Sequence, residues 1–162
     1  MQIQIAEKIR WAFAKKRELG VKTLILVGGR GSAKSTAAAD YVLAHVKGGE
    51  RWCCAREYLN SIDDSCHAML EEEIDRLDMQ GFNVLAREIE HSSGGGIFHK
   101  GLNRNPEALK SIVADGIWIE EGENLSAKTI KLLSASFRIS AAKQARAKKS
   151  GKQAKVPDII GS

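Results

Sequence analysis

The sequence predicts an α/β domain in which a mainly parallel sheet is flanked by helices. Two apolar runs of strand length, residues 21–27 and 116–119, each end in residues suited to chemistry: a glycine-rich turn after the first and two glutamates after the second. Stretches with helical periodicity alternate with short apolar runs, a pattern typical of strands joined by crossover helices. The length of 162 residues suits one such core and is short for two.

The net charge of +5 is concentrated near the C-terminus. Lysines and arginines accumulate after Leu125, where Asp158 is the only acid. We therefore predict a domain over residues 1–138, followed by a basic tail over residues 139–162 that is helical or disordered. Such a tail could contact a polyanion such as double-stranded DNA, although a solvated extension explains the same composition.

Cysteine usage and hydropathy favour the cytoplasm. Cys53, Cys54 and Cys66 are odd in number and have no metal-ligand spacing, which predicts reduced thiols. The sequence contains no apolar run as long as a membrane span and nothing that resembles a signal peptide. We therefore expect a cytoplasmic protein without a membrane partner.

The glycine-rich turn is expected to lie between a strand and a helix. Residues 2–18 predict an amphipathic helix that ends at Gly20. Residues 21–27 follow as a buried strand, and residues 37–46 have the composition of a helix. A strand, a glycine-rich turn and a helix in this order form the context of a phosphate-binding P-loop.

Residues 28–36 fit the P-loop template G-x-x-x-x-G-K-[ST] at Gly28, Lys34 and Ser35. Glycines let backbone N–H groups curl around an anion, and the N-terminus of the next helix adds further N–H groups. We expect Lys34 to reach the β- and γ-phosphates of ATP and the Ser35 hydroxyl to bind Mg²⁺. Ala33 replaces the second glycine of the template, and we expect a negative φ there. The predicted nucleotide-binding residues are Gly28, Gly29, Arg30, Gly31, Ser32, Ala33, Lys34, Ser35 and Thr36.

A strand and a crossover helix follow. Residues 51–56 predict a buried strand that places Arg56 at its end. There Arg56 could contact phosphate or DNA, or form a surface salt bridge, for example with Glu57. Helical spacing predicts the crossover helix over residues 62–77, with a cap in residues 60–64.

A hairpin with a glycine-rich turn comes next. Residues 82–90 and 97–99 have strand character, and the segment between them contains consecutive glycines. His91 and His99 flank this turn. Because neither has a Cys, Asp or Glu partner at ligand spacing, we interpret both as ordinary hairpin residues.

The acidic strand is the second element that carries chemistry. A short helix over residues 106–111 precedes it, and residues 116–121 form an apolar strand that delivers Glu120 and Glu121 at its C-terminal end. Because adjacent residues of a strand point to opposite faces, the two acids can do different work. We expect Glu120 to complete the Mg²⁺ shell and Glu121 to orient and deprotonate the attacking water.

Several motifs occur in the order found in one known family. The matching stretches are Gly28 to Ser35, Cys54 to Glu57, Ser61 to Ser65, Phe98 to Leu102, Asn105 with Pro106, Lys110 with Ser111, and Ile117 to Glu123. On these stretches, residues 24–138 resemble the ATPase domain of the large terminase subunit of tailed bacteriophages. That subunit is the motor that packs double-stranded DNA into procapsids.

The resemblance implies an additional-strand P-loop NTPase fold of the RecA type, with ATP and Mg²⁺ as cofactors. It implies that Arg30 senses or stabilises the γ-phosphate and acts in catalysis with Lys34 and Glu121. Arg138 matches a basic residue at the helix end after the acidic strand. The implied partners are double-stranded DNA, the small terminase subunit, the portal and, in a homo-oligomer, further copies of this chain, in the cytoplasm of a bacterial host.

The resemblance stops after Arg138. In the family, the next strand lies between the P-loop strand and the acidic strand. Residues 156–160 are short and interrupted by Pro157, so we predict a sheet that lacks this strand and has a gap in its place. We expect no nuclease, because Asp158 is the only acid after Glu123.

Three functional hypotheses follow. The first is a packaging ATPase module, truncated relative to its family, that hydrolyses ATP to drive DNA translocation. The second is a catalytically weak protein that binds nucleotide or DNA without motor activity. The third is another P-loop enzyme, such as a small kinase or a helicase-like ATPase, for which we find neither an acceptor lid nor further downstream motifs.

Overall fold

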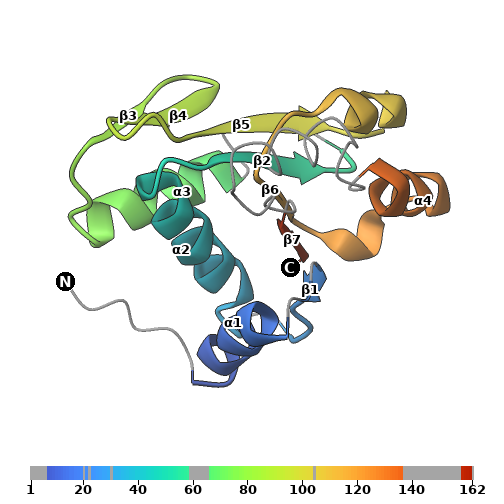
Figure 1. Ribbon diagram of the computed structural model, residues 1–162, viewed down its shortest axis with the longest axis horizontal. Coiled ribbons are helices and arrows are strands. Elements are labelled where there is room, and N and C mark those ends of the chain that lie inside the picture. The colour runs from blue at the N-terminus through green and yellow to red at the C-terminus, as the bar shows by residue number, and fades with distance from the viewer. Residues whose placement is uncertain are drawn as a thin grey trace, which may run out of the picture.

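A seven-stranded sheet forms the centre of the protein, seen in the computed structural model of Figure 1. The structure describes residues 7–19, 21, 23–29, 31–58, 66–103, 105–136 and 158–161. The strands are β1 (Thr23–Ile25), β2 (Arg51–Arg56), β3 (Phe82–Val84), β4 (Glu88–His91), β5 (Gly96–Gly101), β6 (Gly116–Ile119) and β7 (Asp158–Gly161). The helices are α1 (Glu7–Glu18), α2 (Lys34–Lys47), α3 (Cys66–Arg76) and α4 (Ala127–Ser136), with the short 3-10 helices η1 (Pro106–Ser111) and η2 (Gly122–Asn124).

The sheet is mainly parallel, as predicted. Its order is β1-β7-β6-β2-β5-β4-β3. The strands from β1 to β5 in this order pair in parallel, and the antiparallel pair of β4 with β5 confirms the predicted hairpin. The predicted arm over residues 82–90 is instead two strands, β3 and β4, which pair antiparallel with each other. Gly95 is required at the turn of the β4–β5 hairpin, because a Cβ there would lie 2.1 Å from the Val46 carbonyl oxygen.

Side chains alternate across the central strand β2 and divide the core into two layers. Trp52 and Cys54 face the layer that α1, α2 and α3 cover, together with Trp118 and Ile160. Cys53 and Ala55 face the opposite layer, which η1 and α4 cover. Both faces of the central strands are therefore covered, which is why their sequences are continuously apolar.

Helix α2 packs closely against the sheet because its buried face is made of small residues. Ala38 and Ala39 have no exposed surface, and neither do Val42 and Leu43 one turn later. This packing places the start of α2, and with it the end of the P-loop, at the carboxyl edge of the sheet. Within the described part of the chain, no helix combines the length and apolar character needed to cross a membrane.

The predicted gap between the P-loop strand and the acidic strand is wrong. Strand β7 lies there and pairs in parallel with both, so that Leu24, Ile160 and Trp118 are aligned across three neighbouring strands. The prediction failed because it required a long apolar run, whereas four residues suffice when both neighbours supply hydrogen bonds. Pro157 precedes the strand and removes no donor from it.

Strand β7 also corrects the proposed domain division, because residues 158–161 belong to the sheet and not to a tail. Residues 139–157, for which we predict the basic tail, fall outside the described residues, as do Arg138, Gly20 and the predicted helix cap over residues 60–64.

Candidate functional site

The P-loop leaves the sheet at β1 and enters α2, as predicted. Leu26, the first residue after β1, donates its backbone N–H to the Gly161 carbonyl at 2.8 Å, which connects the loop entry to β7. The loop then turns tightly. Gly31 has a φ of +75°, a conformation that favours glycine.

Lys34 folds back over the loop that precedes it. Its ammonium donates to the carbonyl oxygens of Gly28 at 2.7 Å and Gly29 at 3.1 Å, and to Ser32 Oγ at 3.2 Å. Ser35 follows in the first turn of α2 and is half-buried. Lys34 and Ser35 are thus placed at the N-terminus of a helix next to glycine backbone, which is the environment expected of a phosphate site.

Thr36 lies in the same turn and is half-buried. Arg30 lies outside the described residues. Its proposed contact with the γ-phosphate therefore stays a prediction.

The expectation of a negative φ at Ala33 is wrong. Ala33 has φ 57° and ψ 22°, in the left-handed region. The template places glycine at this position because the loop must reverse before α2 begins, and alanine makes the same reversal at a cost of about 1 kcal/mol. The loop therefore still connects β1 to α2, and the backbone strain at Ala33 is the local cost of having alanine where the template has glycine.

Glu120 and Glu121 directly follow β6 and both interact with Arg56. Arg56 Nε lies 3.2 Å from Glu120 Oε2, and Arg56 Nη2 donates to Glu121 Oε1. The expectation that the two acids point to opposite faces is therefore wrong. The alternation holds within a strand, but β6 ends at Ile119 and Glu121 has a left-handed φ of 55°.

Arg56 forms a salt bridge, one of the two roles proposed for it, but not with Glu57. Glu57 is buried and accepts a hydrogen bond from Thr129 Oγ1 at 3.0 Å, which connects the end of β2 to α4. The two residues are 72 positions apart, and no local pattern of the sequence indicates this contact.

The electrostatic environment of Glu120 suits a cation. Burial raises the pKa of its carboxyl above the ordinary value, the Cys66 thiol adds to the rise, and the Arg56 guanidinium opposes it. Within the described structure, Glu120 Oε2 is buried and accepts no hydrogen bond, and it forms an ion pair with Arg56 Nε. Because Mg²⁺ prefers carboxylate oxygens, Glu120 fits the predicted ion once Arg56 moves away from this oxygen.

The topology brings the two predicted elements to the same edge of the sheet. Strands β1, β7 and β6 are parallel neighbours, so the P-loop and the acid pair both leave from carboxyl ends. With neighbouring strands about 4.8 Å apart, the P-loop strand and the acidic strand are separated by roughly 10 Å. Ligands of open α/β sheets bind at this edge.

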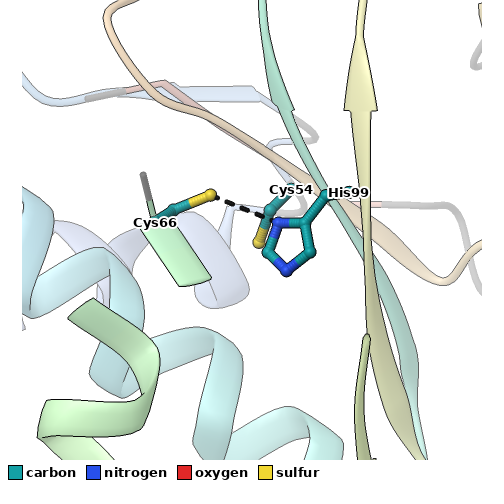
Figure 2. A group of neighbouring side chains, drawn as sticks. All are labelled: Cys54, Cys66 and His99. Carbon is teal, nitrogen blue, oxygen red and sulfur yellow. Dashed lines mark hydrogen bonds between the residues drawn. The ribbon is translucent and has the colours of Figure 1, made fainter. Parts of the chain in front are cut away.

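The two hairpin histidines differ. His91 interacts with Ser93 Oγ and the Gln80 carbonyl, as an ordinary hairpin residue does. His99 instead lies beside Cys54 and Cys66 (Figure 2), which sequence spacing did not indicate. All three cysteines are free thiols, as predicted, and burial raises the pKa of Cys53 to about 12 and that of Cys54 well above its ordinary value.

Solved structures with a similar fold come from bacteriophages. The large terminase of a thermophilic bacteriophage is 10% identical with a TM-score of 0.65, and the alignment covers 98% of this chain and 39% of that one. The same protein in complex with ADP is 10% identical with a TM-score of 0.64, covering 98% of this chain and 38% of that one. The N-terminal domain of the DNA packaging ATPase from bacteriophage phi29 is 17% identical with a TM-score of 0.58, covering 92% of this chain and 76% of that one.

At these identities the solved structures show the fold alone, and this chain spans about two fifths of the thermophilic phage terminase. No curated protein matches the sequence. The family is shown by the sequence model, which matches residues 21–151 and describes the phage terminase large subunit. This chain therefore belongs to the phage terminase large subunit family.

Proposed function

We propose that this chain is an ATPase module of a phage DNA-packaging motor. The loop glycines and the N-terminus of α2 bind the phosphates of ATP, with Lys34 at the β- and γ-phosphates. Ser35 and Glu120 bind Mg²⁺, which when present neutralises charge on the transferred phosphoryl group. Glu121 orients the attacking water and accepts its proton, and Arg30 supplies positive charge at the γ-phosphate.

One observation carries this proposal: the P-loop and the acid pair leave the same edge of a parallel sheet with one strand, β7, between them. This arrangement puts a cationic loop and a carboxylate pair at the ends of two strands that are separated by one strand. The left-handed φ of Glu121 supports a functional role, because strained backbone is retained where surrounding structure requires it.

The process that ATP hydrolysis would drive, DNA packaging, is inferred from the family. One structural relative is a DNA packaging ATPase, and another binds ADP. We propose that this chain acts in the bacterial host cytoplasm on double-stranded DNA, with the small terminase subunit, the portal and other copies of itself as partners. The basic residues after Leu125 would support contact with the DNA backbone.

A second candidate function is nucleotide binding without turnover. It is favoured by the contacts of Arg56, which interacts with both Glu120 and Glu121. Unless Arg56 releases Glu121, this carboxylate is engaged as a salt-bridge acceptor and is a weaker base for water. The two functions therefore predict the same affinity for ATP but different rates of phosphate release.

The test pairs thermal melting with phosphate release on the same purified chain. A ligand at 100 times its Kd stabilises the folded state by about 2.7 kcal/mol. For a chain of this size, this raises the melting temperature by roughly 5–10 °C. Lys34→Ala should abolish the shift produced by Mg-ATP, whereas Lys47→Ala, exposed at the other end of α2, should preserve it.

Glu121→Gln should keep the shift and stop phosphate release, whereas Glu123→Gln, also exposed and close by, should preserve both the shift and the release. A shift without release in the unmodified chain would select the second candidate. A cooperative melt that Mg-ATP leaves unchanged would contradict both.

A further inference from the structure

Three side chains with metal-binding atoms meet on the face of the sheet that α1, α2 and α3 cover. Cys54 lies on β2 and His99 on β5, where the two residues are direct partners in the parallel pairing. Cys66 is the first residue of α3. Figure 2 shows the two thiols and the imidazole directed toward one another, and their ligand atoms all lie within 4.8 Å of one another.

The separation of these atoms matches a shared zinc ion. Zn²⁺ binds cysteine sulfur at about 2.3 Å and histidine nitrogen at about 2.0–2.1 Å. In a tetrahedral site these two bonds place sulfur and nitrogen about 3.5 Å apart. Cys66 Sγ lies 3.5 Å from His99 Nδ1. An S–H···N hydrogen bond has the same length, so this distance is compatible with both the metal-free and the metal-bound cluster.

The other nitrogen of His99 is oriented as it is in metal-binding histidines. His99 Nε2 lies 2.9 Å from His67 Nδ1, with the two rings tilted by 70°. With a metal on Nδ1, the proton of His99 is on Nε2 and is donated to His67. Such a partner fixes the tautomer and the ring plane of the ligand.

The surroundings select a soft metal over Mg²⁺. Cys54 and Cys66 are each 1% exposed. Two thiolates balance the charge of one Zn²⁺, so the bound cluster is neutral and suits a buried site. Thiolate and imidazole bind zinc well, whereas Mg²⁺ prefers oxygen. His99, unlike the two cysteines, is half-buried.

From this geometry we propose that Cys54, Cys66 and His99 bind one Zn²⁺ ion, with water as the fourth ligand. The ion joins the start of α3 to strands β2 and β5. It also lies behind the acid pair, because the backbone of Cys66 hydrogen-bonds to Glu120. Zinc thus stabilises the interior side of the candidate ATP site without taking part in nucleotide binding.

Cys53 provides a matched control. It neighbours Cys54 on β2 and has no exposed surface, but it belongs to the opposite layer of the core with Ala55 and Ile117. Cys53→Ala and Cys54→Ala therefore remove the same group from equally buried positions of one strand. Only Cys54→Ala removes a ligand of the proposed ion.

The experiment titrates Co²⁺ and Zn²⁺ into the reduced, metal-free chain. We expect one equivalent of Co²⁺ to produce the visible absorption of a tetrahedral thiolate site, and Zn²⁺ to displace it. Cys54→Ala and Cys66→Ala should lose the absorption, and Cys53→Ala should retain it. His67→Ala should weaken binding by about 10–100-fold, the usual effect of losing a partner of a ligand.

His99→Gln is a second test in case the cysteine variants fail to fold. It removes a ligand from a half-buried position, where a substitution disturbs the core less. A variant that melts cooperatively without metal and yet binds no Co²⁺ supports the site. Two outcomes would overturn it: no binding by the unmodified chain, or equal binding by folded Cys66→Ala or His99→Gln variants. Neither outcome depends on ATP, so the result is independent of the proposed ATPase activity.

Discussion

The two strands that deliver the candidate ATP site differ sharply in burial. Strand β6, which ends at the acid pair, is buried along its whole length, with Ile117 and Trp118 fully covered. Strand β1, which ends at the P-loop, is the edge of the described sheet and pairs with β7 alone. Ile25 on it is 70% exposed, and Val27 just after it is 91% exposed.

This difference shows that the P-loop is positioned mainly by the helix after it and by β7, and less by its own strand. Helix α2 is deeply buried, whereas β1 contributes three residues and one line of strand pairing. The acid pair is in contrast fixed by the strand that precedes it. Substitutions in the two regions should therefore have very different effects.

The largest expected effect is on β6. Trp118→Ala leaves a cavity at the centre of the sheet and should lower the free energy of unfolding by about 3–5 kcal/mol. Val27→Ala, at the exposed end of the P-loop strand, should change it by less than about 0.5 kcal/mol. Urea unfolding of both variants measures the contrast, and equal losses would mean that the two strands are equally buried.

The next effect tests β7. Ile160 has no exposed surface and lies between Leu24 and Trp118, so Ile160→Ala should cost about 3 kcal/mol. It should also reduce the melting shift produced by Mg-ATP, because β7 is the sole strand partner of β1 in the described sheet. Ile130→Ala, half exposed on α4, is the control. A silent Ile160→Ala variant would exclude residues 158–161 from the sheet.

A pH-dependent effect is expected from α2. Burial and the neighbouring Glu73 raise the pKa of Asp40 from 3.8 to about 6, although Arg76 opposes the rise. The folded state then binds this proton more tightly than the unfolded state does. The free energy of unfolding should therefore fall as the pH rises from about 4 to about 6, by about 2–3 kcal/mol.

Asp40→Asn should flatten this part of the pH profile and raise stability above pH 6. Asp75→Asn, on the exposed side of α3, should leave the profile unchanged. Chemical unfolding at a series of pH values provides the comparison. A profile of the unmodified chain that rises across this range would show that the ion pair with Arg76 outweighs the burial of Asp40.

The smallest effect concerns the P-loop itself. Ala33→Gly removes the strain of the left-handed φ and should raise the free energy of unfolding by about 0.5–1 kcal/mol. The same substitution at Ala44, exposed and helical on α2, should lower it by about 1 kcal/mol. Thermal melting distinguishes the signs. A loss at both positions would place Ala33 outside the left-handed region.

Local features of the sequence predicted most of the elements. The glycine-rich turn between β1 and α2, the β4–β5 hairpin and the acidic strand were placed correctly, because glycine chemistry and hydrophobic periodicity act within a few neighbouring residues. The predicted buried strand over residues 21–27 is wrong, because β1 has only three residues and lies at the exposed edge of the described sheet. The prediction failed at Ala33, where the required backbone conformation comes from the loop and not from the residue type.

Contacts between distant residues could not be predicted in this way. Arg56 and Glu121 are 65 positions apart, and Cys66 and His99 are 33 apart. These contacts depend on the order of strands in the sheet, which no local sequence pattern indicates. Strand β7 was missed for the same reason, since its four residues form a strand by lying between two others.

The sequence by itself determined the glycine-rich turn between a strand and a helix and the two carboxylates after an apolar strand, because these features belong to side chains and short turns. The tertiary structure alone decided that β7 closes the sheet, that one arginine interacts with both acids, and that two thiols meet an imidazole. The physical reason is that these contacts follow from the pairing of strands, which depends on the burial of the whole sheet and not on any single segment.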